Sequence, residues 1–383
     1  MRHFSKRRVT RSVKRHILYD ALVFLVILLS FLGFLFYASA VRDAVREALT
    51  LCGNVLIPSL FPCMVLSTLL IESGAASGIG KRAEKVMRAL FRLPGESAVP
   101  LFLGLAAGYP VGARSAIALY EAGHLTSDEA ERLLAFTNNS GPAFIFGAVG
   151  FSLFSSGKAG LILFFSHLAA TFTVGLLFRF HGKEKKCPSI SAPDNSRPPF
   201  AAAFASSVKA SALSVLHIAA FVVFFSAAIR VLYESGAIPR IADGISSLTA
   251  IPAATAENLL IGLIEMTGGL TRIASEAGTL SGKLAMAAFL LGWAGISVHC
   301  QVLSFLGEKK LSFLPYFLGK FAHGAFSALF VFFFARLFPL SSPVSLSESF
   351  SGALYLSPAA LAALSLLTGG VLWTFSVPAE KKL

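Results

Sequence analysis

The stretch LAFTNNSGPAFIFG, residues 134–147, interrupts an apolar helical pattern with amide, hydroxyl, glycine and proline residues. Glycine weakens a helix, and proline removes a backbone donor. In hydrocarbon each freed backbone group costs several kcal/mol, so unwound backbone at membrane depth lies inside protein or beside a cavity. The stretch therefore predicts a broken membrane helix with Asn138, Asn139 and Ser140 at the break.

The composition around this stretch is typical of a membrane protein. Of the 383 residues, 55% are hydrophobic and 14% are charged, and the mean hydropathy is +0.72. Soluble domains carry about 25% charged residues. The basic residues behind the net charge of +13 lie between apolar runs, so we expect no nucleic-acid partner. The chain is predicted to be an all-α polytopic protein of the cell membrane, with the lipid bilayer around it.

Long apolar runs predict helices that can cross a bilayer, which takes about 20 residues. They cover about 17–37, 45–73, 159–180, 207–233, 312–338 and 358–377. Pro58 and Pro62 predict a kink in the second of these helices. The basic, amphipathic segment Lys81–Leu93 is typical of a helix lying in the membrane interface. Thr126, followed by Glu129, predicts a capped helix start.

Four further apolar segments are interrupted, and they form two related sets. They cover about 97–123 and 127–155 in the first half, and 256–278 and 282–305 in the second. LFLGLAAGYPVGAR (101–114) aligns without gaps with LLIGLIEMTGGLTR (259–272), which pairs Arg114 with Arg272. This match and three others occur in the same order along both halves. They predict an internal duplication.

Topology predicts how the two repeats are related. If 97–123 and 256–278 re-enter on one side while the broken helices cross, each repeat crosses the membrane three times. The second repeat is then inverted, the chain crosses eight times, and both termini lie inside. Lys and Arg concentrate in cytoplasmic loops, and the segments placed inside hold 24 of the 33 basic residues. The predicted divisions are 1–40 (basic N-terminus and first helix), 41–180 (repeat 1), 181–203 (cytoplasmic loop), 204–338 (inverted repeat 2) and 339–383 (last loop and C-terminal transmembrane helix).

Broken helices at corresponding positions of inverted repeats are the usual pointer to the substrate site of a transporter. The N-terminus of a half-helix offers free N–H groups that suit an anion, and unwound carbonyls suit a cation. The alternative is a set of proline kinks whose amides bond neighbouring helices. Because the interruptions come in two related sets, the pattern favours a cavity.

Two arginines occupy equivalent places just after the interruptions. Brought together at a pseudo-twofold axis, Arg114 and Arg272 would hold a compact dicarboxylate through forked contacts. The alternative is that each side chain reaches its own membrane interface or pairs locally, Arg272 with Glu265 or Glu276. For Arg114 the two interpretations weigh equally, and for Arg272 the functional one is favoured slightly.

Other polar residues complete the candidate site. Glu265 lies within an apolar run, and an ionisable group at membrane depth suggests function by default. His299 follows the second break and is suited to hydrogen-bond a solute or carry a proton, although a lone histidine in an apolar helix is more often a packing residue. The candidate substrate-binding residues are Asn138, Asn139, Ser140, Arg114, Arg272, Glu265, Thr267 and His299.

The sequence contains no recognisable catalytic set. It lacks a Walker-type phosphate loop, a GxSxG motif and an HExxH motif, so we do not expect an enzyme. The histidines at 167, 217 and 323 have no ligand-like spacing, and the four cysteines are scattered, so no metal is predicted. No cofactor is expected. A coupling ion, Na⁺ or H⁺, stays open because unwound carbonyls leave no side-chain pattern.

Several motifs resemble a known family. GYPVGAR (108–114), SDEAERLLAFTNNSGP (127–142) and GLIEMTGG (262–269) are similar to segments of the YlbJ-type sporulation integral membrane proteins, the stage V sporulation group. These belong to the wider set with a nucleoside-recognition Gate domain. The resemblance spans about Ala44 to the C-terminus. It implies a fold similar to concentrative nucleoside transporters, and passage of dipicolinate from the mother cell towards the forespore.

Residues and resemblance together predict a transporter of a small organic anion, with dipicolinate as first candidate, that works by alternating access. A nucleoside-type carrier of a neutral solute is the first alternative, with Glu265 bonding a ribose. The second alternative is a non-transporting membrane scaffold in spore or envelope assembly. The outer forespore membrane is one expected location, and a homo-oligomer stays open.

Overall fold

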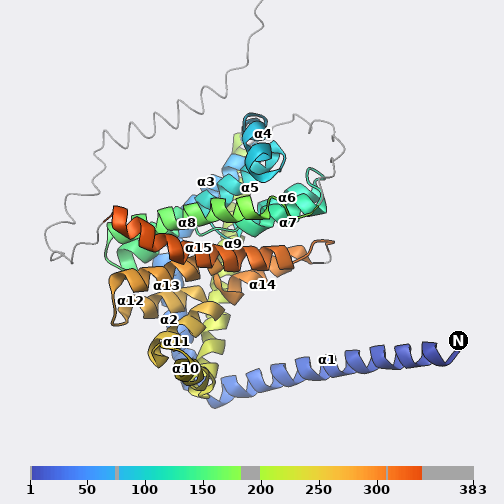
Figure 1. Ribbon diagram of the computed structural model, residues 1–383, viewed down its shortest axis with the longest axis vertical. Helices are drawn as coiled ribbons and strands as arrows, with labels where there is room; N and C mark the ends of the chain where they lie inside the picture. The colour runs from blue at the N-terminus through green and yellow to red at the C-terminus, as the bar shows by residue number, and fades with distance from the viewer. Residues whose placement is uncertain (1, 74–76, 183–198, 308, 339–383) are drawn as a thin grey trace, which may run out of the picture. The chain divides into compact units, whose positions relative to one another are not determined.

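The computed structural model describes residues 2–73, 77–182, 199–307 and 309–338. All of the regular structure in this part of the chain is helical (Figure 1). Five helical segments are long and apolar enough to cross a membrane: Tyr19–Phe36, Gly157–Phe178, Phe200–Glu234, Leu280–Leu306 and Leu314–Leu337. The helix predicted at 358–377 lies outside the described residues.

The chain begins with two long helical stretches. Helix α1 (Arg2–Phe36) starts earlier than predicted, because the basic segment before the apolar run is also helical. Helix α2 (Ala38–Leu51) passes through a π-helical turn, η1 (Cys52–Leu56), into α3 (Ile57–Glu72). The predicted irregularity thus takes the form of a widened turn just ahead of the two prolines, which lack the N–H that a regular turn needs.

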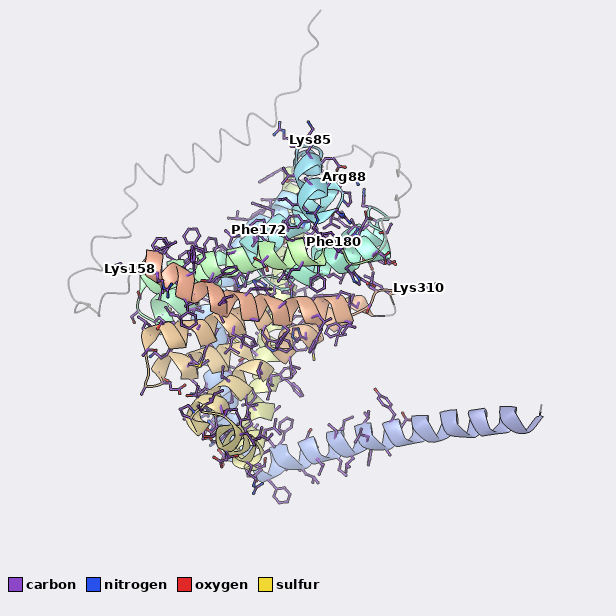
Figure 2. All side chains as sticks on the ribbon, viewed as in Figure 1. Lys85, Arg88, Lys158, Phe172, Phe180 and Lys310 are labelled. Atoms are coloured by element: carbon purple, nitrogen blue, oxygen red, sulfur yellow. The ribbon has the colours of Figure 1, made fainter. Side chains whose placement is uncertain are left out.

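The rest of the first half consists of shorter helices and one long one. They are α4 (Ser77–Phe91), η2 (Gly95–Ser97), α5 (Ala98–Ala107), α6 (Val111–Glu121), α7 (Ser127–Thr137), η3 (Ala143–Leu153) and α8 (Gly157–Phe178). Lys85 and Arg88 project from α4, the amphipathic helix expected from the sequence (Figure 2). The interruptions predicted in 97–123 and 127–155 are confirmed, because α5 and α7 both end where predicted.

The second half follows a similar order. It contains α9 (Phe200–Glu234), α10 (Ala237–Leu248), α11 (Ala253–Ile264), α12 (Met266–Ser275), α13 (Leu280–Trp293), α14 (Gly295–Leu306) and α15 (Leu314–Leu337). The breaks predicted in 256–278 and 282–305 are confirmed at Glu265 and Ala294. Helix α10 was not predicted. It is short and amphipathic, with Ile238 and Ala242 buried, so it carries no long apolar run.

Glycine contacts hold each interrupted pair of helices together. A Cβ atom added at Gly104 or Gly112 would lie 1.8 or 2.0 Å from the carbonyl oxygen of Thr137, so α5 and α6 pack backbone to backbone against the end of α7. In the second half, a Cβ atom on Gly269 would lie 2.2 Å from the Cα atom of Gly262. Only glycine permits these approaches, and the two interrupted pairs are therefore tight hairpins, named here the first hairpin (α5–α6) and the second hairpin (α11–α12).

Each helix break lies against the hairpin tip of its own half. A Cβ atom on Gly141 would lie 3.1 Å from the backbone nitrogen of Gly108, which ends α5 with φ +84°. A Cβ atom on Gly295 would lie 3.1 Å from the backbone nitrogen of Met266. In each half, the unwound backbone of the hairpin tip therefore lies against the unwound backbone of the broken helix.

Helices α8 and α15 pack side by side and join the two halves (Figure 1). The ring centroids of His167 on α8 and His323 on α15 are 4.2 Å apart. Both side chains are buried, and α15 also packs against α7 and α13. The pair of long helices thus positions polar side chains behind the first break.

Candidate functional site

A narrow cavity lies between the tips of the two hairpins. Its volume is about 30 Å³, which is room for about two water molecules. This central cavity is lined by polar or backbone groups of both halves: Gly108, Tyr109, Ser140 and Gly141 from the first, and Glu265, Met266, Thr267, Ser297 and Gln301 from the second. The four interruptions therefore surround one shared site.

The two hairpin tips contact each other across the central cavity. The hydroxyl of Tyr109 donates a hydrogen bond to the Sδ atom of Met266, 2.6 Å away. Tyr109 follows the end of α5, and Met266 begins α12. Both residues also line the cavity, so the contact lies at its wall.

Glu265 is buried in the central cavity, with 2% of its surface exposed. Its carboxylate accepts hydrogen bonds from the backbone N–H groups of Thr267 (3.0 Å) and Gly268 (2.8 Å), and from the Thr267 hydroxyl. The side chain thus caps the N-terminus of α12, where a negative charge is favourable. In the aligned repeat the equivalent residue is Ala107, and α6 has Pro110 as its N-cap residue and no side-chain cap. Of the two hairpins, only the second therefore has a carboxylate that caps the N-terminus of its second helix.

The three polar residues of the first break point in different directions. Ser140 lines the central cavity, and its hydroxyl has no hydrogen-bond partner within the described residues. The amide of Asn138 donates to the Tyr316 hydroxyl (3.0 Å), while that of Asn139 donates to the carbonyl of Phe136 (3.0 Å). Both asparagines are fully buried against neighbouring helices. The structure therefore places Ser140 in the cavity and the two asparagines behind it.

An open pocket adjoins the central cavity and is rich in basic groups. This Arg114 pocket, about 420 Å³, lies between α6, α9 and α14. Arg114, Lys209 and His217 line it, and its described lining contains no Asp or Glu. Gln301 lines both this pocket and the central cavity. Gln301 is 3% exposed, and its Oε1 atom has no hydrogen-bond partner among the described residues, so it is a polar group at the junction of the two spaces.

A second open pocket adjoins the central cavity through Glu265. This Arg272 pocket, about 460 Å³, contains two acidic and two basic side chains, those of Glu47, Glu265, Arg230 and Arg272. The guanidinium carbon of Arg272 lies 5.5 Å from the centroid of the Tyr233 ring, a cation–π contact. Arg114 lines the first open pocket and Arg272 lines the second, so the two arginines face different spaces in this conformation.

Of the remaining candidates, Thr267 lines the central cavity with Glu265, and His299 does not. His299 is buried; its Nδ1 atom lies 3.2 Å from the Tyr316 hydroxyl, and its ring makes an edge contact with Trp293 at 4.3 Å. Its Nε2 atom is buried and has no hydrogen-bond partner within the described residues, so the choice between a packing role and a role in solute binding stays a prediction.

Three further polar residues lie at or behind the central cavity and were not predicted from the sequence. Tyr109 and Gln301 line the central cavity, and the Nζ atom of Lys320 donates to the carbonyl oxygen of Asn138 at 2.7 Å. Lys320 is the only Asp, Glu, Lys or Arg between Leu314 and Ala335, and such a charge within an apolar helix was a usable signal. Gln301 carried no comparable sequence signal, because a single amide in an apolar helix does not indicate which neighbour or cavity it faces.

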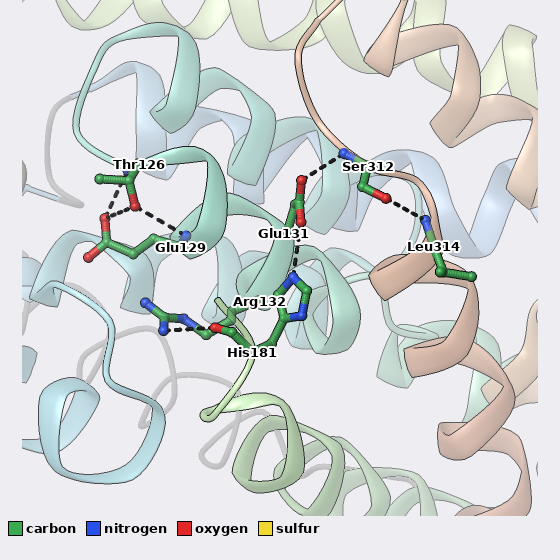
Figure 3. A network of polar contacts seen from close by, with 7 residues as sticks. All are labelled: Thr126, Glu129, Glu131, Arg132, His181, Ser312 and Leu314. Atoms are coloured by element: carbon green, nitrogen blue, oxygen red, sulfur yellow. Dashed lines mark hydrogen bonds and ion pairs between the residues drawn. The ribbon is translucent and has the colours of Figure 1, made fainter. Parts of the chain in front are cut away.

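A separate polar network surrounds the start of α7 (Figure 3). The Thr126 hydroxyl accepts from the backbone N–H of Glu129 (3.3 Å), whose carboxylate accepts in return from the backbone N–H of Thr126 (2.8 Å). This confirms the predicted capped start. Glu131 contacts the His181 ring (3.0 Å) and accepts from the backbone N–H of Ser312 (2.7 Å). The network joins α7 to the end of α8 and to the segment before α15, and its role is structural.

These features define a polytopic helical membrane protein built around a buried polar site. A family model described as Gate, nucleoside recognition, matches residues 55–220. The chain is 31% identical over 310 residues to the sporulation integral membrane protein YlbJ of Bacillus subtilis (strain 168), and the match covers 76% of each chain. No solved structure matches the chain. The chain therefore belongs to the YlbJ family of integral membrane proteins and is a multi-pass membrane protein.

Proposed function

We propose that this protein transports a small organic anion across a membrane by alternating access, with dipicolinate as the first candidate. The central cavity carries this proposal, because it adjoins two different open pockets. Gln301 connects it with the Arg114 pocket, and Glu265 connects it with the Arg272 pocket. A solute site reached from two sides is what alternating access requires. The name of the Bacillus relative supports a role in sporulation, for which the outer forespore membrane is a fitting location.

The two pockets lie at different depths along α9. Lys209 lines the Arg114 pocket, whereas Arg230 lines the Arg272 pocket. On α9 the lining of the Arg114 pocket runs from Ser206 to Phe221, and that of the Arg272 pocket runs from Ser226 to Tyr233. At a rise of about 1.5 Å per residue, the midpoints of these two stretches lie about 24 Å apart along the helix. This separation supports one entrance on each side of the membrane.

The charge of the Arg114 pocket supports an anionic solute. Arg114 and Lys209 are basic, no acidic residue balances them in the lining, and the start of α6 nearby has no capping side chain. Such a pocket concentrates anions. Phe221 and Phe305 also line it and offer apolar faces to a flat aromatic ring.

The proposed topology has eight crossings, both termini inside, and residues 41–180 and 204–338 as inverted repeats. The similar order of helices in the two halves supports the duplication. With this topology, and in a background without the four native cysteines, a thiol reagent added from the inside labels a Lys310→Cys variant in intact membranes and leaves a Gly278→Cys variant unlabelled. The reverse pattern contradicts the orientation. The proposal includes no enzymatic step.

One observation favours a second candidate. The matching family model is described as nucleoside recognition, and a neutral nucleoside would use Glu265 and Gln301 as hydrogen-bonding groups without needing Arg114. A third candidate, a non-transporting scaffold, requires no solute at all.

Equilibrium binding to the purified protein in detergent separates these candidates. Dipicolinate and uridine are titrated against the natural chain, Arg114→Gln, Arg272→Gln and the control Arg240→Gln, whose side chain lies exposed on α10. We expect saturable dipicolinate binding that weakens at least about tenfold in Arg114→Gln, the loss typical of a charge-assisted contact of 1.5–3 kcal/mol. Uridine binding alone favours the nucleoside carrier. Absence of binding by a folded protein favours the scaffold.

A further inference from the structure

Lys320 is a buried lysine beside the first helix break. It lies on α15, none of its surface is exposed, and its Nζ atom donates to the carbonyl oxygen of Asn138 at 2.7 Å. Asn138 ends α7, so this carbonyl is one that the break has freed from helical bonding. Within the described residues, no ion pair involves Lys320.

Polar side chains and backbone groups surround the carbonyl that Lys320 contacts. The backbone N–H of Ser140 donates to the Nε2 atom of His167 at 3.0 Å, and the Thr171 hydroxyl donates to the Asn139 side chain at 3.2 Å. The hydroxyl of Tyr316 accepts from the amide of Asn138, and the ring of His323 lies against that of His167 at an angle of 41°. Side chains of α8 and α15 thus bond several polar groups of the unwound segment, and Lys320 is the lysine among them.

Freed carbonyls at membrane depth are the groups that bind coupling cations in transporters with broken helices. Here the side-chain nitrogen of a lysine donates a hydrogen bond to such a carbonyl. We infer that the ammonium of Lys320, bonded to the carbonyl oxygen of Asn138, takes the place of an inorganic coupling cation at the first break. The solute site is then complete without Na⁺. This inference rests on the proposed transport function.

Lys320 acts as a tethered cation, that is, a cation covalently attached to the chain, and it contacts only the first of the two breaks. When His167 is aligned with His323, the residue of α8 that corresponds to Lys320 is Phe164. The second break therefore has no equivalent lysine. The asymmetry between the two halves parallels that of Glu265, which has Ala107 as its counterpart.

Thermal unfolding of the purified protein tests the inference without any solute. Unfolding temperatures are compared in NaCl and in choline chloride at equal ionic strength. We expect the natural chain to unfold at the same temperature in both salts. Lys320→Ala opens space beside the Asn138 carbonyl, so Na⁺ should raise its unfolding temperature by a few degrees relative to choline. Lys320→Met keeps this space filled and should show no such rise, and neither should Lys158→Ala, which alters an exposed lysine.

Two results overturn the inference. One is stabilisation of the natural chain by Na⁺ relative to choline, and the other is a folded Lys320→Ala variant that responds equally to both salts. If Lys320→Ala does not fold, solute uptake by the natural chain in proteoliposomes decides. Equal dipicolinate uptake with Na⁺ or choline supports the tethered cation, and a strict Na⁺ requirement overturns it. Absence of uptake in both media counts against the transport function alone. The inference about Lys320 is then judged by whether Na⁺ stabilises the natural chain relative to choline.

Discussion

Tyr109 and Met266, 157 residues apart in the chain, join the tips of the two hairpins through a hydrogen bond of 2.6 Å from hydroxyl to sulfur. An O–H···S contact is weak, because a thioether is a poor acceptor. This contact between the hairpin tips therefore adds little to the packing of the long helices that holds the two halves together.

Loss of this contact should make the central cavity more accessible. In a background without the four native cysteines, we expect Tyr109→Phe to raise the labelling rate of a Ser297→Cys variant by a small, water-soluble thiol reagent several-fold. Ser297 lines the cavity and is 2% exposed. Tyr120→Phe, which alters a half-buried tyrosine on α6, serves as control. An unchanged rate in Tyr109→Phe would show that the contact does not hold the cavity closed.

The basic character of the Arg114 pocket should depend on Lys209. Replacing this exposed lysine by Gln removes one of the pocket's positive charges. We expect dipicolinate to bind about two- to fivefold more weakly, the range for an exposed charge pair. The effect should shrink at high salt because screening weakens exposed charges. Lys158→Gln is the matched control, and an equal loss of uridine binding would contradict an electrostatic role.

The close packing of the first hairpin predicts a sharp difference between two glycines. A Cβ atom at Gly104 would meet the Thr137 carbonyl oxygen at 1.8 Å, whereas one at Gly147 would meet nothing within 4 Å. Gly104→Ala should therefore lower the free energy of unfolding by about 1–3 kcal/mol, the usual cost of overpacking. Gly147→Ala should leave it nearly unchanged. Thermal unfolding in detergent measures both, and equal stability of the two variants would contradict the described packing.

Glu131 should contribute to stability through the network at the start of α7. Its carboxylate accepts from the backbone N–H of Ser312 at 2.7 Å and contacts His181 at 3.0 Å. Glu131→Ala should cost about 1–2 kcal/mol, since bonds to charged groups exceed neutral ones. Asp243→Ala, which removes an exposed carboxylate on α10, is the control. Comparable unfolding temperatures for the two variants would argue against the link between α7 and the segment before α15.

The interruptions could be predicted from the sequence because backbone chemistry is local. Gly108 and Pro110 end and restart a helix whatever surrounds them, and Asn138 to Pro142 act similarly. Helix α10 escaped prediction for a physical reason. A short amphipathic helix needs only a few buried residues, such as Ile238 and Ala242, and leaves no long apolar run.

The candidate site was less predictable, because side-chain direction depends on packing. Arg114 and Arg272 are equivalent in sequence and yet line different pockets. Asn138 and Asn139 lie at the break but turn towards their own and neighbouring helices, whereas Ser140 faces the cavity. The sequence locates these residues at or near the breaks, but it does not show which space each side chain faces.

The small size of the central cavity has an electrical consequence. A space of about 30 Å³ cannot hold a continuous file of water or hydrated ions between the two open pockets. Without a change of conformation, we therefore expect the protein to conduct no salt. A membrane crowded with many copies would therefore keep its voltage while no cargo is passing.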